Sequence, residues 1–176
     1  MKVYLIRHSE PTYDQVTAAN LHGYGRELGA LTTRGIQIAR KRAHDPLFKN
    51  VQLILASPYT RALQTALEFV RYNDLPLKVE LDLREWQPDN TGKRADNDQQ
   101  AAAAYQAYLE HPHVRPADCP FHYDTAEEMR TRFTNVLKRY AANYNCIACI
   151  SHGEIIHQLG DWNALDYCDV REMDVN

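Results

Sequence analysis

The sequence lacks any long hydrophobic run. Nowhere in its 176 residues do the roughly 18 consecutive apolar residues occur that a membrane-spanning helix requires. The apolar run at the amino terminus, Val3 to Ile6, is too short for the core of a secretory signal, and Arg7 and His8 follow it at once. We therefore expect no membrane partner and a cytoplasmic location.

Cysteine is also scarce, with only Cys119, Cys146, Cys149 and Cys168 present. Four are too few for a disulfide scaffold in a chain of this length. Cys146 and Cys149 have the C-x-x-C spacing of redox or metal pairs, but no second pair completes a zinc site. Both lie in the apolar run 146–150, which favours packing in the core.

No charge of one sign dominates. The chain has 20 basic and 23 acidic residues, a net charge of −3 and a pI near 6.2. Such a chain has no overall basic field to recruit nucleic acid or an acidic membrane, so an anion would have to bind to a local cluster of positive charge. With 44% hydrophobic and 24% charged residues, the composition is typical of a soluble globular protein. The length predicts one domain over residues 1–176, at most with a modest insertion.

Strand and helix patterns alternate along the chain. Short apolar runs predict strands, and amphipathic stretches predict helices between them. Ser57-Pro58 is a good helix start, and Thr125 to Glu128 has the form of a capping box. The expected strands are Lys2–Ile6, Val51–Ala56, Leu77–Leu81, Cys146–Ile150 and a last edge strand within Tyr167–Val175; the expected helices cover 31–43, 57–72, 101–110, the stretch after Thr125 and the stretch after Glu154. This order predicts a three-layer α/β/α fold with a mainly parallel central sheet.

One region interrupts the alternation and forms an insertion of about residues 87–124. It begins with the polar stretch 87–100, continues as a short helix over 101–110 and ends in the proline-broken segment 112–124. An insertion at this place is a candidate lid. A solvated excursion without a role is an equally good interpretation.

Chemically useful side chains follow four of the expected strands. Arg7 and His8 follow the first, Arg61 the second, Glu85 the third and His152 the fourth. The ligand crevice of an open α/β sheet lies at the carboxyl ends of its strands, so the topology brings these five residues to one edge.

This set suits covalent phosphoryl transfer. Two arginines hold and neutralise a phosphate through their forked donors. A neutral imidazole attacks phosphorus when its other nitrogen is held as a donor, and a carboxylic acid protonates the leaving alcohol. A second histidine can hydrogen-bond the phosphoryl oxygens. None of these steps needs a metal or another cofactor, and no acidic cluster suited to Mg²⁺ is evident.

Five segments in this order resemble the histidine phosphatase superfamily, also called the phosphoglycerate mutase-like family. They are Leu5-Ile-Arg-His-Ser-Glu10, Leu31-Thr-Thr-Arg-Gly-Ile-Gln-Ile-Ala39, Ser57-Pro-Tyr-Thr-Arg-Ala-Leu-Gln-Thr-Ala66, Leu83-Arg-Glu-Trp86 and Ser151-His-Gly-Glu-Ile-Ile156. The resemblance implies that His8 accepts the phosphoryl group and that Glu85 is the proton donor and later the base that activates water. It also implies a phosphate pocket formed by Arg7, His8, Ser9, Arg61 and His152.

The sequence departs from the family pattern in three places. Ser9 replaces the usual glycine after the nucleophilic histidine, although its carbonyl can still orient His8. Asp14 stands where many members have asparagine, and a carboxylate there would repel a phosphate unless it is protonated or turned away, so it stays outside the predicted catalytic set. The part after His152 is short, which abbreviates the carboxyl-terminal part of the sheet.

The modest insertion and short tail favour a phosphatase over a mutase, because a small lid admits water to a phosphohistidine. A mutase, a phosphatase for phosphohistidine or phosphotyrosine in proteins, and a non-catalytic phosphate-binding module are the alternatives. Lys93, Arg94 and Arg115 are candidates for holding a second anionic group, with a solubilising surface as the competing interpretation. Trp86, Tyr13 and Tyr24 are candidates for packing against a sugar or base, or for a structural role. The expected partner is a small phosphorylated substrate, and no feature of the sequence indicates an oligomeric state.

Overall fold

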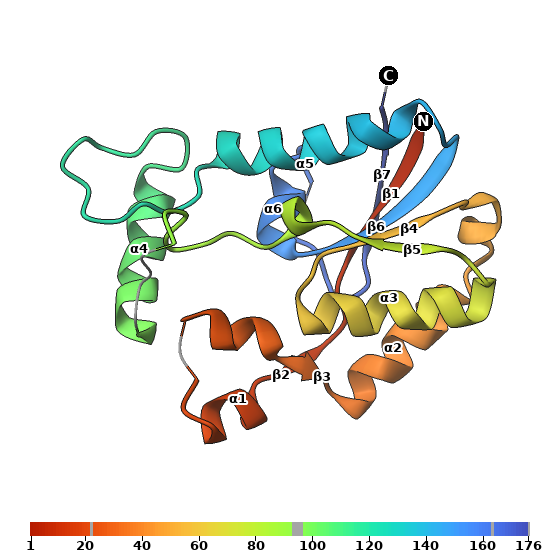
Figure 1. The fold of residues 1–176 in the computed structure, drawn as a ribbon, viewed down its shortest axis with the longest axis horizontal. Coiled ribbons are helices and arrows are strands. Elements are labelled where there is room, and N and C mark those ends of the chain that lie inside the picture. Colours follow the sequence, from red (N-terminus) through yellow and green to blue (C-terminus); the bar gives the residue numbers. More distant parts are fainter. Residues whose placement is uncertain (22, 93–96, 163, 176) are drawn as a thin grey trace.

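The computed structural model describes residues 1–21, 23–92, 97–162 and 164–175, and its centre is a five-stranded sheet (Figure 1). The strands lie in the order β5-β4-β6-β1-β7. They are β1 (Lys2–Arg7), β4 (Ile54–Ala56), β5 (Leu77–Val79), β6 (Cys146–Ser151) and β7 (Val170–Asp174). The pairs β1–β6, β6–β4 and β4–β5 are parallel, and β7 runs antiparallel to β1. The mainly parallel sheet and its last edge strand are confirmed.

Helices cover both faces of the sheet, as Figure 1 shows. One layer holds α2 (Thr33–Ala43) and α3 (Thr60–Asn73), and the other holds α5 (Ala126–Ala141) and α6 (Gly153–His157). The strands supply both cores through their alternation of side chains. Val3 and Leu5 pack in the cluster on the α5 and α6 side, whereas Tyr4 and Ile6 pack in the cluster on the α3 side. The three-layer α/β/α prediction is confirmed.

The same alternation explains the two cysteines of β6. Cys149 packs in the cluster with α5, and Cys146 packs in the cluster with α3, so their side chains belong to opposite faces of the sheet. Both are buried and both thiols are free. A C-x-x-C spacing within a strand therefore separates the two sulfur atoms, and the core-packing interpretation is confirmed.

Local capping sets where the helices begin. Thr125 and Glu128 form the predicted capping box at the start of α5. The expected start of α3 at Ser57-Pro58 is wrong, because the chain bends at Pro58, Tyr59 is extended as the N-cap residue, and the helix begins at Thr60. Ser57 instead uses its hydroxyl at the site described below. In α2 the Thr32 side chain accepts a hydrogen bond from the Gly35 amide at 2.8 Å, so that helix begins at Thr33.

Several short elements were not predicted, because two-residue strands and single helical turns have no periodicity to detect. Between β1 and α2 the chain forms a small antiparallel pair and a short helix; these elements are β2 (Pro11–Thr12), β3 (Ala30–Leu31), α1 (Asp14–Ala18) and a 3₁₀ helix over Gly23–Leu28. Two more 3₁₀ helices span Pro46–Asn50 and Leu81–Leu83. The last of these replaces the end of the predicted third strand, which stops at Val79.

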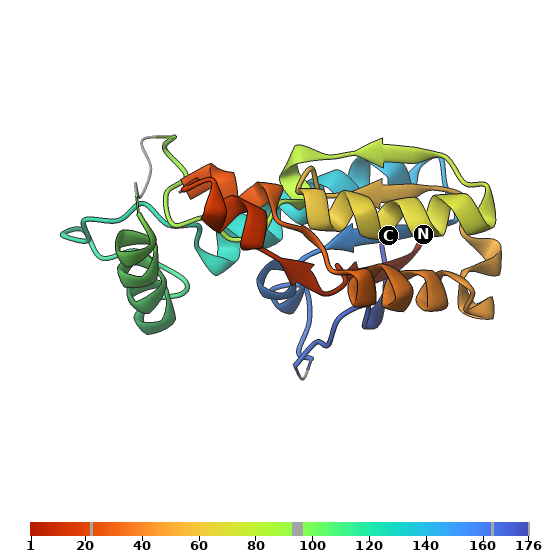
Figure 2. The ribbon, with the colours of Figure 1, turned by 90° about the horizontal axis from the view of Figure 1, so that it is seen from below.

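The insertion lies at one end of the molecule, away from the sheet (Figures 1 and 2). Its helix, α4 (Asp98–Glu110), begins before Ala101 because the side chain of Asn97 caps it by accepting from the Gln100 amide at 2.8 Å. The two ends of the insertion meet where the Asp124 amide donates to the Gln87 carbonyl at 2.9 Å. Within the described residues, no helix is long and apolar enough to cross a membrane.

Candidate active site

His8 lies directly after β1, and 5% of its surface is exposed. Its Nδ1 is 2.7 Å from the Ser9 carbonyl oxygen, and the Arg61 Nε donates to its Nε2 at 3.2 Å. A carbonyl can only accept and a guanidinium can only donate, so the ring is the neutral tautomer with its proton on Nδ1. Burial and the positive charge of Arg61 lower the pKa of His8 to about 3, against the opposing hydrogen bond to Ser9. The Nε2 lone pair is therefore present at neutral pH.

Ser9 holds His8 from behind and is itself fully buried. Its amide donates to the Thr65 hydroxyl at 3.0 Å, and its own hydroxyl donates to the Gly35 carbonyl at 2.6 Å. Both hydrogen-bond donors of Ser9, which the sequence placed among the phosphate-binding residues, are thus engaged within the protein. Its contacts are those of a residue that orients His8.

Two guanidinium groups flank the imidazole. Arg7 donates through Nη1 to the Leu165 carbonyl and lies 4.7 Å from the centre of the Tyr167 ring, while its buried Nε has no hydrogen-bond partner. Arg61 lies over the Tyr59 ring at 5.1 Å. Within the described part of the chain, no carboxylate forms an ion pair with either arginine. The pair leaves a local positive charge of the kind that a phosphate dianion neutralises.

His152 follows β6 and is completely buried, with its ring centre 5.1 Å from that of His8. Its Nε2 is 2.7 Å from the Ser57 hydroxyl, and its buried Nδ1 has no partner in the described structure. Burial first, and then the positive charge of Arg61, lower its pKa well below the usual value. When Ser57 donates to Nε2, the Nδ1 proton is free to donate to an anion.

Glu85 lies beside the start of α6, in the segment that follows the 3₁₀ helix Leu81–Leu83. Its carboxyl group accepts hydrogen bonds from the backbone amides of Trp86 at 2.9 Å, Ile155 at 3.1 Å and Glu154 at 3.2 Å. Burial raises its pKa, although the amides of Trp86 and Glu154 and the charge of Arg61 act in the opposite direction. The group therefore holds its proton to higher pH than an ordinary glutamate.

The remaining candidates from the sequence have other surroundings. Asp14 is exposed at the start of α1. Arg115 forms a two-pronged ion pair with Glu128 at 2.6 and 2.7 Å, which ties the insertion to α5. Lys93 and Arg94, and the side chain of Tyr24, lie outside the described residues.

Two of the aromatic candidates pack against protein groups. The Tyr13 ring lies against Arg26 at 5.1 Å. Trp86 packs against Tyr105 and Tyr108 of α4, with ring centres 5.2 and 5.6 Å away. These contacts favour the structural interpretation for Tyr13 and make Trp86 the link between the Glu85 segment and the insertion.

Four residues at this site were missed by sequence reasoning. Ser57 and Tyr59 contact His152, the latter ring to ring at 5.0 Å, and Tyr167 covers Arg7. The Glu154 carboxylate accepts hydrogen bonds from the hydroxyls of Tyr108 at 2.7 Å and Tyr105 at 3.3 Å. The position of Ser57 directly after β4, and that of Glu154 in the first helical turn after β6, were usable signals. The contact of Tyr167 depends on how the chain returns toward β7, for which the local sequence has no signature.

The arrangement offers one uncharged imidazole nitrogen, two guanidinium groups, a second buried imidazole and a carboxyl group that resists ionisation. In the described residues, no group of three or more histidine, cysteine or acidic side chains is arranged to hold a metal ion. An α/β sandwich with this cationic cluster beside the carboxyl ends of its parallel strands defines a class of anion-binding sites.

Comparison with known families specifies the class. The model of the histidine phosphatase superfamily (branch 1) matches residues 3–175, and the chain belongs to this superfamily. A comparison with curated proteins finds no match. The fold is similar to that of a mycobacterial glucosyl-3-phosphoglycerate phosphatase, with a TM-score of 0.72 and 16% identity over 98% of this chain and 90% of that one.

Two further solved structures show the same fold. YhfR of Bacillus stearothermophilus has a TM-score of 0.73 and 16% identity, covering 99% of this chain and 91% of that one. The alpha-ribazole phosphatase of Shigella flexneri has a TM-score of 0.69 and 22% identity, covering 100% of this chain and 91% of that one.

Proposed function

We propose that this protein is a phosphatase that hydrolyses phosphomonoesters of small molecules through a phosphohistidine on His8, without a metal. The observation that carries the proposal is the state of the His8 ring. Its Nδ1 is held by the Ser9 carbonyl, and its Nε2 is an acceptor next to Arg61. That is the form in which an imidazole attacks phosphorus.

In the first step, Nε2 of His8 forms a bond to phosphorus while the bond from phosphorus to the alcohol oxygen breaks. Glu85, whose raised pKa favours its protonated form, gives its proton to the leaving oxygen. The guanidinium groups of Arg7 and Arg61 and the Nδ1 proton of His152 neutralise the phosphoryl oxygens as charge moves between them.

In the second step, water attacks the phosphohistidine. The Glu85 carboxylate takes a proton from the water, the oxygen forms a bond to phosphorus, and the bond from phosphorus to Nε2 breaks. Inorganic phosphate leaves, and Glu85 is again protonated. The amides of Glu154 and Ile155 hold the carboxylate in its ionised form between the two steps.

Hydrolysis is preferred to a mutase reaction because the insertion is modest, and a small lid admits water to a phosphohistidine. The phosphatase names of two proteins with the same fold support this choice. A mutase would require a bisphosphate primer and would release no inorganic phosphate.

The test is hydrolysis of 4-nitrophenyl phosphate in the presence of EDTA. We expect release of inorganic phosphate, its abolition in His8→Ala, and full activity in the control His113→Ala, which removes an exposed histidine of the insertion. Brief exposure to a labelled substrate should leave an acid-labile, base-stable label on the protein. Activity retained by His8→Ala would exclude the nucleophile, and phosphate release without that label would exclude the covalent step.

A further inference from the structure

The segment that carries Glu85 has little regular structure of its own. It leaves the 3₁₀ helix at Leu83 and runs into the base of the insertion at Gln87. Backbone carbonyl groups in such a segment must find donors elsewhere when they are shielded from water. The donors that this segment uses therefore determine where the Glu85 carboxyl group lies.

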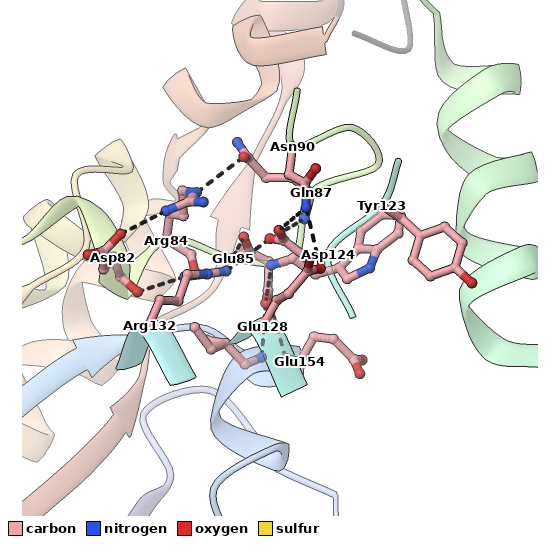
Figure 3. A network of polar contacts seen from close by, with 12 residues as sticks. Asp82, Arg84, Glu85, Gln87, Asn90, Tyr123, Asp124, Glu128, Arg132 and Glu154 are labelled. Carbon is pink, nitrogen blue, oxygen red and sulfur yellow. Dashed lines mark hydrogen bonds and ion pairs between the residues drawn. The ribbon is translucent and has the colours of Figure 1, made fainter. Parts of the chain in front are cut away.

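Arg132 of α5 supplies most of those donors (Figure 3). Its Nη1 donates to the carbonyl oxygens of Asp82 at 2.6 Å and Arg84 at 2.7 Å, and its Nη2 donates to that of Glu85 at 3.1 Å. The Ser151 hydroxyl donates a hydrogen bond to the carbonyl oxygen of Leu83, which lies between them in the chain, at 2.7 Å. All four carbonyl groups from Asp82 to Glu85 are thus held by side chains of two other elements.

A buried guanidinium needs a counter-charge, and Asp124 provides it. The Arg132 Nη2 lies 3.1 Å from Asp124 Oδ2, and the two side chains are 10% and 3% exposed. The Asp124 carboxylate also accepts from the Gln87 amide at 3.2 Å and from the Asn90 side chain at 3.3 Å. One ion pair therefore fixes both the Glu85 segment and the base of the insertion.

The geometry requires an arginine. A planar fork reaches several carbonyl oxygens and a carboxylate at once, whereas a lysine presents a single compact charge. The neighbouring cavity, lined by Asp82, Arg84, Asn90, Asp124 and Arg132 among others, is not a second ligand site by this reasoning. Its two arginines are already paired with the two aspartates at 3.1 Å each.

We propose that Arg132, held by Asp124, is a positioning residue for the general acid Glu85. It touches no reacting atom. It fixes the backbone of residues 82–85, from which the Glu85 side chain extends to the amides at the start of α6. Small displacements of a catalytic group reduce rates strongly, so loosening this contact should impair proton donation specifically. This inference rests on the proposed function of Glu85.

The test compares two aryl phosphates that differ in how much they need a general acid. The leaving group of 4-nitrophenyl phosphate departs readily without a proton, and that of phenyl phosphate is more basic. The measured quantity is kcat/KM, which reports the step that expels the alcohol when that step is irreversible. Glu85→Gln should lower kcat/KM for both esters, and the fall should be about tenfold or more greater for phenyl phosphate than for 4-nitrophenyl phosphate.

Arg132→Lys should show the same selectivity to a smaller extent, about three- to tenfold. Arg139→Lys is the matched control, since Arg139 is an exposed residue of the same helix that pairs with Glu80 at 2.6 Å, and it should leave both rates unchanged. A purely structural loss would lower both rates by the same factor. If Glu85→Gln is selective and folded Arg132→Lys is not, the positioning role is overturned.

A second variant tests the proposal even if Arg132→Lys does not fold. Asp124→Asn keeps the shape of the side chain and removes its charge, and it should give the same selectivity more weakly. A folded Asp124→Asn without selectivity would then contradict the proposal. If the wild type releases no phosphate from either ester, or Glu85→Gln shows no selectivity, the proposed function fails instead, so the two failures are distinguishable.

Discussion

The phosphate pocket and the segment 82–85, which carries the general acid Glu85, are held in place by different means. In the pocket, Arg7 is the last residue of β1, His8 is the next residue, and His152 directly follows β6. Their positions come from the paired strands β1 and β6. Glu85 lies beyond a 3₁₀ helix, and the side chains of Arg132 and Ser151 hold its backbone. The sheet thus builds the nucleophile directly, whereas the acid depends on contacts distant in the sequence.

The two regions also titrate in opposite directions. Burial, together with Arg61, keeps the pocket histidines neutral by lowering their pKa values. Burial raises the pKa of Glu85 and so favours its neutral form. The reacting nitrogen is therefore uncharged at neutral pH, the acid holds its proton to higher pH than an ordinary glutamate, and the positive charge of the pocket belongs to the arginines.

The largest effect is expected from breaking the pocket at Arg61. Arg61→Gln removes one phosphate donor and the positive charge beside His8, so kcat/KM should fall about 10³-fold. The pKa of His8 should rise at the same time, because Arg61 is one cause of its depression. Steady-state kinetics and an NMR titration of His8 measure the two effects. Arg71→Gln, which changes an exposed arginine of the same helix that pairs with Glu68, should change neither.

Breaking the acid should have the next largest effect. Glu85→Gln should lower kcat/KM for an alkyl phosphomonoester about 10²-fold. In the wild type, activity should rise with pH as His8 loses its proton near pH 3 and fall with pH as Glu85 loses its own above the usual range for glutamate. The ratio of the wild-type profile to that of Glu85→Gln isolates the basic limb. A ratio independent of pH would show that Glu85 is not the acid.

The contrast between the two regions also explains what could be predicted from the sequence. The positions of Arg7, His8 and His152 at strand ends could be predicted, because apolar strands are recognisable as local patterns and the carboxyl ends of parallel strands meet at one edge. Glu85 was predicted from its place after the third expected strand, and its role from the family resemblance, but the residues that hold its segment were not predicted. Arg132 is one of several arginines on an amphipathic helix, and nothing local distinguishes it from Arg130 or Arg139. Its role depends on packing between α5 and the segment 82–85, which are far apart in the sequence.

The free energy of unfolding should depend on pH in opposite directions through the two regions. His8 titrates at 6.5 when unfolded and near 3 when folded, so its contribution is complete above pH 6.5 and is lost as pH falls below that value. For one group, the free energy of unfolding changes by at most about 1.4 kcal/mol per pH unit, which is a factor of about ten in the unfolding equilibrium constant. Glu85 acts oppositely, since its raised pKa favours the fold below its usual value and costs stability as pH rises.

Urea unfolding at several pH values, with the two variants His8→Gln and Glu85→Gln beside the wild type, measures these slopes. The free energy of unfolding of His8→Gln should fall less steeply toward acid than that of the wild type. Glu85→Gln should gain on the wild type as the pH rises toward neutrality. Parallel curves for all three proteins would contradict the assignment of buried neutral groups to both regions.

The smallest effect is expected where the insertion contacts Glu154, the residue whose amide donates to Glu85. Tyr108 of α4 donates its hydroxyl to Glu154 at 2.7 Å, and the amide of Glu154 donates to Glu85 at 3.2 Å. Tyr108→Phe removes one hydrogen bond to a charged group, which should lower the free energy of unfolding by about 1.5–3 kcal/mol. Its kcat/KM should change by less than about threefold, because the Glu85 backbone is held by Arg132 rather than by α4.

The matched variant is Tyr105→Phe, which removes a hydroxyl 3.3 Å from Glu154 and should have a smaller effect on stability. A tenfold loss of activity in Tyr108→Phe would mean that α4 helps to position the acid, and the boundary between the two regions would then include the insertion helix.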